Sequence, residues 1–306
     1  MHEVLRDSLT FWDGVRTAFG LVLIGGIDAL DRETPHTAVA LLQGSRRSVW
    51  TLEWKARLIL NDPDPNGPAW IIGLEGETCS VSEAGTQEHS SIDVQSRPDK
   101  FGRVLGGCTS AQALLVVGYR NQVAARNVGS DRWEFVDQGL PGKIDDAPRV
   151  FGLEAIDTCA TGWYAAGLHG ALHVRAGGRW REIASPTNVR LMAVHCADDG
   201  MVYACGQFGT VLSGTSDRWD IALEIEGLPS LWDIASLGPD LYVSSFAVLY
   251  KLSNGECLPV DFSAYELGPA GLPTSFFRLS RRNGALLSIG SKDVLELAEG
   301  VWTRII

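Results

Sequence analysis

Four residues of this sequence could support acid and base chemistry if the fold brought them together. His195 and Asp157 occupy similar places in two successive apolar stretches, and Asp233 and Arg278 lie in the corresponding stretches further along the chain. An imidazole, two carboxylates and a guanidinium could act as a general acid or base with a cationic partner. The same side chains could instead line a water-filled channel without catalysing a reaction, and we favour this second interpretation.

Compact motifs of the common enzyme classes are absent from the sequence. It contains no P-loop, no Gly-x-Ser-x-Gly motif and no Cys-x-x-Cys pair. His169 and His173 are four residues apart, but on a hairpin this spacing spans a turn instead of one helical face. We therefore expect no metal site and no cofactor, and we favour a non-catalytic protein over an enzyme.

The charge balance limits the classes of partner. Lys and Arg together number 26 against 37 Asp and Glu, so the formal net charge is -11. This argues against nucleic acid, which needs a basic surface, and favours an encounter with a basic protein.

The N-terminal region and the cysteines predict a cytoplasmic protein. Glu3, Asp7 and Asp13 stand where a secretion signal would carry Lys or Arg, and the apolar run over residues 18–27 is too short to span a bilayer. We expect no membrane association. The six cysteines suggest buried thiols in a reducing compartment, although Cys196 and Cys205 could face each other across one hairpin as a disulfide.

A repeat organises the whole chain. Short apolar runs end in Gly or Ser at spacings of 39 to 49 residues, and each copy resolves into four stretches of five to eight residues, bounded by turn residues. The residues that end the second stretch of each copy are Gly25, Gly73, Gly118, Gly167, Gly206, Ser245 and Gly290. A period of this size predicts an all-β, seven-bladed β-propeller of four-stranded antiparallel blades.

A tryptophan follows the third turn in four of the seven copies. Trp133, Trp180, Trp219 and Trp302 hold this position, whereas the sixth copy has Cys257 there. We expect the ring to seal each blade against the next one, and the Gly or Asp before it to supply the positive φ of a tight hairpin.

The turns that carry these tryptophans resemble those of a known superfamily. "GSDRW", "GGRW" and "TSDRW" are similar to the Asp-box turn of sialidase-type (BNR) propellers and, more broadly, to WD40/YVTN repeat-like propellers. The resemblance covers most of the chain and implies a propeller, but the full Ser-x-Asp-x-Gly-x-x-Trp box is never complete. A sialidase would need clamped arginines and a Tyr nucleophile, and the arginines here cluster in turns.

The chain is expected to form one propeller domain over residues 1–306. The ring could close by simple packing of the last blade on a first blade that begins at residues 8–17. Alternatively, residues 2–7 could add a strand to the last blade. The sequence leaves both open.

The loops between the second and third strands predict a binding face. In most soluble proteins such tips carry small polar residues, but here Tyr119, His169, Phe208 and Phe246 supply one large ring per copy. The connections between blades on the same face add acidic residues, namely Asp145, Asp146, Glu224 and Glu226. Aromatic residues surrounded by acid suit docking of a basic protein.

We therefore predict a protein-protein interaction module, in its most concrete form a bacterial immunity or adaptor protein that neutralises a basic toxin or enzyme. The alternative is a hydrolase or lyase that acts on glycans or small molecules at the channel mouth. A third possibility is an assembly scaffold with several weak partners.

Overall fold

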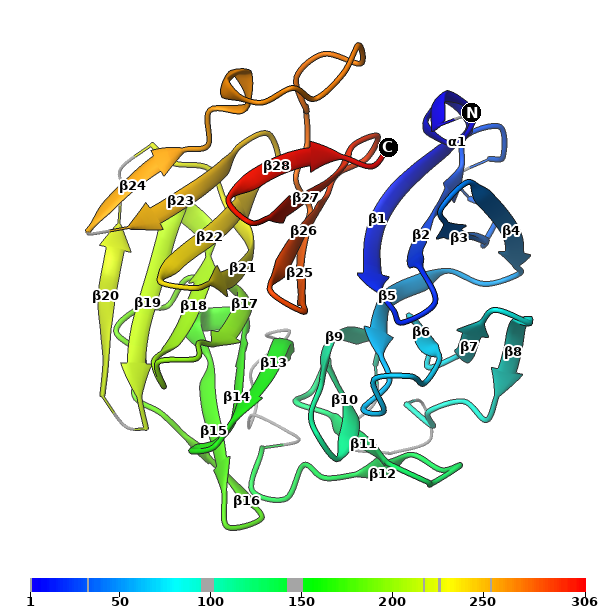
Figure 1. Cartoon of the computed structure of the whole chain (residues 1–306). Helices are drawn as coiled ribbons and strands as arrows, with labels where there is room; N and C mark the ends of the chain where they lie inside the picture. Colours follow the sequence, from blue (N-terminus) through cyan, green and yellow to red (C-terminus); the bar gives the residue numbers. More distant parts are fainter. Residues whose placement is uncertain are drawn as a thin grey trace.

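The computed structural model is a ring of seven blades around a central channel (Figure 1). It describes residues 2–31, 33–94, 102–141, 151–216, 218–224, 227–253 and 255–306, without the side chains of residues 2–4 and 224. Each blade is a four-stranded antiparallel sheet whose strands follow one another in the sequence. The predicted fold class, blade number and strand number are confirmed.

The strands of the seven blades have the following bounds. Blade 1 contains β1 (Leu9–Arg16), β2 (Leu21–Ile27), β3 (Thr37–Gln43) and β4 (Arg46–Leu52); blade 2 contains β5 (Ala56–Asn61), β6 (Ala69–Gly73), β7 (Thr78–Ser82) and β8 (Gly85–His89); blade 3 contains β9 (Val104–Thr109), β10 (Ala113–Gly118), β11 (Val123–Asn127) and β12 (Glu134–Phe135). Blade 4 contains β13 (Leu153–Cys159), β14 (Gly162–Gly167), β15 (Leu172–Ala176) and β16 (Arg179–Glu182); blade 5 contains β17 (Leu191–Cys196), β18 (Val202–Gly206), β19 (Thr210–Thr215) and β20 (Arg218–Glu224). Blade 6 contains β21 (Leu231–Leu237), β22 (Asp240–Ser245), β23 (Leu249–Ser253) and β24 (Glu256–Pro259); blade 7 contains β25 (Arg278–Arg282), β26 (Ala285–Ile289), β27 (Val294–Ala298) and β28 (Val301–Arg304). One helix, α1 (His2–Ser8), precedes blade 1.

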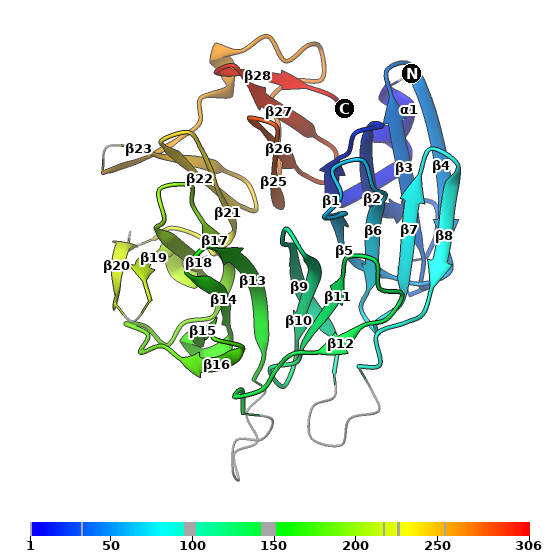
Figure 2. The same ribbon diagram turned by 60° about the horizontal axis from the view of Figure 1, so that its bottom comes forward.

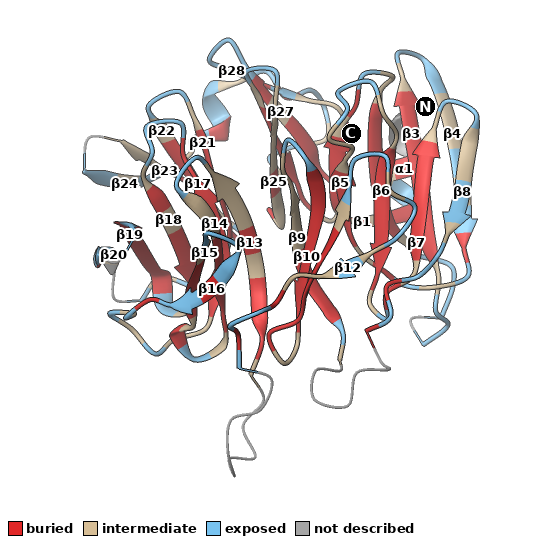
Figure 3. Cartoon of the chain, turned by 90° about the horizontal axis from the view of Figure 1, so that it is seen from below, coloured by how far each residue is buried: buried red, intermediate tan, exposed pale blue. Residues whose placement is uncertain are grey.

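The first strand of each blade is the inner strand and lines the channel, while the fourth strand lies at the rim (Figures 1 and 2). Burial follows this order, because the second and third strands are buried and the rim strands carry most of the exposed residues (Figure 3). We call the side with the turns between second and third strands and the connections between blades the connection face. The opposite side, with the other two turns of each blade, is the hairpin face.

The repeated glycine is required by a close backbone approach. Gly206 has an extended backbone, and a Cβ placed there would lie 2.1 Å from the carbonyl oxygen of Arg190, in the connection to its own inner strand. A Cβ at Gly167 would likewise lie 2.1 Å from the carbonyl oxygen of Gly152. In this position a side chain would push the inner strand away from the second strand.

The recurrent tryptophan seals the ring as expected, but toward the other neighbour. Trp180 of blade 4 is buried against blade 3, where its Nε1 donates to the carbonyl oxygen of Val136 at 2.8 Å. Trp219 of blade 5 meets Tyr164 of blade 4, with ring centroids 6.2 Å apart. The prediction that each ring packs against the following blade is therefore wrong, because both rings contact the preceding blade.

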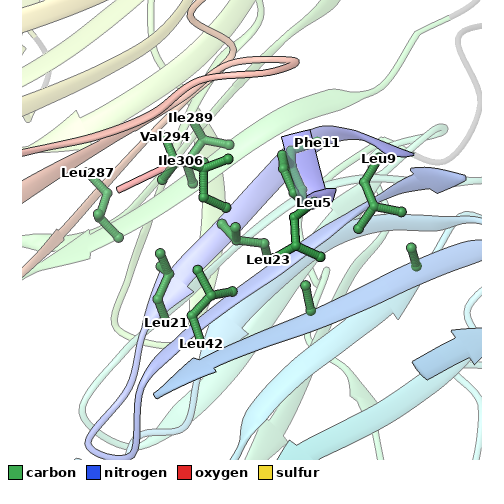
Figure 4. Close-up of a cluster of buried hydrophobic side chains, with 12 residues drawn as sticks. Leu5, Leu9, Phe11, Leu21, Leu23, Leu42, Leu287, Ile289, Val294 and Ile306 are labelled. Atoms are coloured by element: carbon green, nitrogen blue, oxygen red, sulfur yellow. The ribbon is translucent and has the colours of Figure 1, made fainter. Parts of the chain in front are cut away.

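The ring closes without a strand shared between its first and last blades. Residues 2–8 form a helix instead of an extra strand, and blades 1 and 7 are separate four-stranded sheets. The backbone N–H of Phe11 donates to the carbonyl oxygen of Ser291 at 2.9 Å across this junction. One apolar cluster joins the two blades, shown in Figure 4, with Leu5 of α1, Phe11 of β1 and the C-terminal Ile306 among its members. Of the two closures that the sequence left open, the first is confirmed.

The six cysteines are free thiols. Across the hairpin of blade 5, Cys196 pairs with Val202, and Cys205 pairs with Ala193. The two sulfurs are thus not opposite one another, and the incidental disulfide considered from the sequence is not formed.

Closure by one cluster predicts that Phe11 is a sensitive position. Phe11 is fully buried, so Phe11→Ala should lower the free energy of unfolding by about 3 to 5 kcal/mol. Urea denaturation followed by tryptophan fluorescence measures this change. Phe208→Ala, at an exposed turn, serves as the control and should cost less than about 1 kcal/mol. Equal losses in the two variants would contradict the role of Phe11 in closing the ring.

Candidate functional site

The central channel contains a cavity of about 250 Å³ whose wall comes from all seven inner strands. His195, Asp157, Asp233 and Arg278 all lie on this wall, as the sequence suggested. The question is whether their polar groups are available for chemistry or already engaged by the fold.

The channel carboxylates connect neighbouring blades. Asp233 accepts a hydrogen bond from the backbone N–H of Ile234 at 3.0 Å, and its second oxygen accepts from Leu279 of the next inner strand at 2.8 Å. A carboxylate thus satisfies one backbone donor in each of two adjacent blades. The same arrangement recurs at Asp13, with Gly14 and Ile59, and at Asp157, with Thr158 and Cys196.

His195 has a similar structural role. Its Nε2 accepts from the backbone N–H of Ser236 in the next blade at 3.0 Å, and the Ser236 hydroxyl lies 2.8 Å from the same nitrogen. The neutral ring then carries its proton on Nδ1, which is 3.5 Å from Asp157. Ser236, His195 and Asp157 thus have the order of a hydrolase triad, but a backbone donor already occupies the lone pair that would activate the serine.

Arg278 connects the two carboxylates that flank blade 7. Its Nε lies 3.6 Å from Asp13 in blade 1 and 3.6 Å from Asp233 in blade 6. The charge of Asp233 raises the pKa of Arg278, and burial raises the pKa of Asp13 while Arg278 opposes that shift. The positive charge of Arg278 therefore offsets part of the negative charge of Asp13 and Asp233 on either side of blade 7.

On the connection face, two turns hold a large side chain at a strained position. His169 and Phe208 have φ of 59° and 56°, in the left-handed region that non-glycine residues rarely adopt, and a glycine with positive φ follows each of them. Both side chains are exposed, and Phe208 is 68% exposed. In the matching turn of blade 3 this place is held by Arg120, with φ of 57°. Tyr119 precedes it and is half-buried.

Phe246 belongs to a cluster of three aromatic rings that was not predicted from the sequence. Its ring centroid lies 6.0 Å from that of Trp232 and 5.6 Å from that of Phe277, and the last two rings stack at 5.4 Å. Phe246 is 55% exposed and Trp232 36% exposed. The turn of Phe208 contacts β21, the strand of Trp232, so these aromatic residues share one region of the connection face.

A bulge explains why Trp232 faces this way. The register of β21 against β22 shifts between Leu231 and Asp233, so Trp232 is the extra residue and points out of the blade. The same shift occurs between Phe11 and Asp13. The signal in the sequence was an aromatic residue directly before the channel residue of an inner strand.

The acidic part of the predicted face is not placed by the structure. Asp145, Asp146 and Glu226 lie outside the described residues, and Glu224 is described only as the backbone end of β20. The two histidines considered as metal ligands lie in different environments. His169 is exposed at the turn, whereas His173 is buried within β15.

Comparison with known proteins places the chain in a family. It is 34% identical to "Immune protein Tsi7" of Pseudomonas aeruginosa (strain PAO1) over 244 residues, which is 79% of this chain and 77% of that protein. The chain belongs to the Tsi7 family. This agrees with the prediction of a bacterial immunity protein that works through protein-protein interaction. No family model matches the sequence.

Solved structures confirm the fold of this Tsi7 relative. The computationally designed Ika8 protein matches 98% of the chain, and 86% of that chain, with a TM-score of 0.62 at 8% identity. The WD40 propeller domain of Doa1 matches 82% of this chain and 81% of that one (TM-score 0.59, 11% identity), and U3-55K matches 82% and 80% (TM-score 0.60, 11% identity). The WD40-like resemblance seen in the sequence is confirmed at the level of fold. Among the described residues, no helix is long and apolar enough to cross a membrane.

If the channel carboxylates connect blades, removing one should destabilise the ring. Asp233→Ala leaves two backbone donors without an acceptor and Arg278 without one of its charges, so we expect a loss of about 3 to 5 kcal/mol in the free energy of unfolding. Urea denaturation measures the loss. The exposed Asp199→Ala is the control, and an Asp233→Ala protein as stable as this control would show that the channel groups are free.

His173 should make the fold sensitive to acid. Burial lowers its pKa from 6.5 to about 4, so the folded state keeps the ring neutral while the unfolded chain takes up a proton. The stability due to neutral His173 is complete above pH 6.5 and falls, as the pH drops toward 4, by up to about 1.4 kcal/mol per pH unit. Urea titrations at several pH values should show a smaller decline for His173→Leu. Parallel curves for the two proteins would contradict this assignment.

Proposed function

We propose that the protein is an immunity protein that binds one bacterial toxin through its connection face and thereby neutralises it. The observation that carries this proposal is the similarity to Immune protein Tsi7 over more than three quarters of both chains. A propeller supports such a role, because rigid blades present a broad surface of turns that can differ in sequence while the ring stays the same.

The aromatic residues of the connection face are the proposed anchors. Phe208 and Phe246 expose large apolar surfaces, and the backbone at Phe208 is held in a conformation that costs free energy. Exposed rings held on a rigid scaffold lose little conformational entropy on binding, and aromatic side chains are enriched among the residues that dominate binding energy. We include Trp232 and Phe277 with them, since the four rings share one region, and His169 and Tyr119 at its edge.

We further propose that the partner is basic. The protein carries a formal charge of -11, which accelerates encounter with a positively charged surface and repels nucleic acid. Asp145, Asp146, Glu224 and Glu226 would supply the acidic rim around the aromatic anchors. Such a rim affects the association rate and its salt dependence more than the final affinity.

We place the protein in the cytoplasm as a single domain. Its six free cysteines suit a reducing compartment, and the apolar cluster between blades 1 and 7 supports a single domain. We do not propose the channel hydrolase, because the His195 lone pair is engaged by Ser236.

The test compares two pairs of exposed apolar residues in a capture experiment. Phe208→Asp/Phe246→Asp alters the connection face, whereas Val128→Asp/Val301→Asp alters residues of similar exposure, 59% and 53%, at turns of the hairpin face. Tagged proteins are used to capture partners from the native cells. We expect one stoichiometric basic partner for the wild type and the hairpin-face variant, and roughly 1,000-fold weaker binding for the connection-face variant.

Capture is completed by a growth assay with the identified partner. Its expression should stop growth, and coexpression of the wild type should restore it, while Phe208→Asp/Phe246→Asp should not. Circular dichroism confirms that each variant is folded. A captured protein that is harmless to the cell would contradict the immunity role, and equal protection by the two variants would contradict the proposed face.

A further inference from the structure

The sixth blade lacks the tryptophan that four other blades carry near the start of their last strand. Cys257 pairs with Leu252 across the last hairpin of blade 6, as Trp302 pairs with Leu297 in blade 7. The two positions are therefore equivalent. A thiol replaces an indole that would otherwise reach toward the preceding blade.

A groove lies beside Cys257 between blades 5 and 6. It has a volume of about 250 Å³, and it is lined mainly by apolar groups from both blades. Tyr203 and Leu223 come from blade 5, and Leu241, Leu252 and Cys257 come from blade 6. An apolar cavity of about 150 Å³ in a protein interior can take up benzene, so this groove has room for a two-ring aromatic molecule.

Two other junctions between blades also lack this tryptophan, and other side chains make contacts there. In blade 2, Thr86 stands at the tryptophan position, and the adjoining Gly85 faces Trp50 of blade 1, whose Nε1 lies 3.8 Å from the place of a Cβ. Between blades 7 and 1, Arg16 and Glu296 form an ion pair at 2.6 Å. The groove at Cys257 has neither of these substitutes in its lining.

The residue before Cys257 is acidic, whereas the residue before the tryptophan in blades 4 and 5 is basic. Arg179 and Arg218 precede Trp180 and Trp219, but Glu256 precedes Cys257 and is exposed at the edge of the groove. We propose that this groove binds a small planar aromatic molecule that carries a positive charge. Its ring takes the place of the absent indole, and its cation lies beside Glu256. This site is separate from the connection face.

Tryptamine is the probe, since it joins an indole ring to an ammonium group. The readout is the rate at which a maleimide modifies Cys257, measured by peptide mass spectrometry, with the half-buried Cys159 in the same sample as the reference. Tryptamine is titrated to about 20 mM, above the roughly millimolar dissociation constant that a ligand of this size can reach. We expect the Cys257 rate to fall at least fivefold and saturably, with no change at Cys159.

Two kinds of variant test separately how the indole ring and the ammonium group of tryptamine contribute to binding. Binding is followed by ligand-observed saturation-transfer NMR. Cys257→Trp should abolish the tryptamine signal by filling the groove, whereas Cys257→Ala should retain it. Glu256→Arg, at an exposed residue, should weaken tryptamine about fivefold and favour indole-3-acetate instead. This second change keeps the test decisive if Cys257→Trp fails to fold.

An unchanged Cys257 rate at the highest tryptamine concentration would overturn the proposal. So would a folded Cys257→Trp protein that binds tryptamine as the wild type does. Equal affinity of Glu256→Arg and the wild type for tryptamine would refute the cationic ligand. None of these results bears on capture of a toxin by the connection face.

Discussion

The fold depends on joining blade 7 to blade 1 without a shared strand. Contacts of two kinds do this: the apolar cluster around Phe11 and Ile306, and ion pairs that include Arg16 with Glu296 and Arg278 with Asp13. The first kind buries apolar surface, and the second satisfies charges that burial would otherwise penalise. Both ends of the chain are therefore needed for one closed ring.

This closure also determines what the channel can do. The carboxylates of Asp13, Asp157 and Asp233 each accept backbone donors from two blades, and His195 accepts one from the blade that follows it. Polar side chains that looked like a catalytic group in the sequence thus maintain the spacing of the inner strands. On the connection face, in contrast, the side chains of Phe208 and Phe246 are 68% and 55% exposed.

Much of the fold could be predicted from the sequence, because the repeated glycine and tryptophan each solve one local packing problem in the blades that carry them. The orientation of Trp180 could not, since the residues that it contacts in blade 3 are known only once the blades are stacked. The exposure of Phe208 could be predicted, because this aromatic residue lies in a turn between two strands. Trp232 was missed because a one-residue bulge turns its side chain out of the blade, and Phe277 because its stacking on Trp232 depends on how blades 6 and 7 are placed.

The groove at Cys257 could be predicted only in part from the sequence. Its position was evident as an interruption of the tryptophan pattern, but only the three-dimensional arrangement shows that blade 5 leaves the space unfilled, whereas Trp50 fills the comparable place at blade 2. A repeat predicts which position should seal a junction. It does not predict whether a neighbouring side chain will substitute.

We propose that the connection face of this protein covers the toxin that it neutralises. Hydrogen-deuterium exchange of the protein with and without the captured toxin tests it most directly. We expect slower exchange on binding at residues 168–170, 207–209 and 246–248, and unchanged exchange at the hairpin turns near Val128 and Val301. Protection confined to the hairpin turns, with the connection face unaffected, would contradict it.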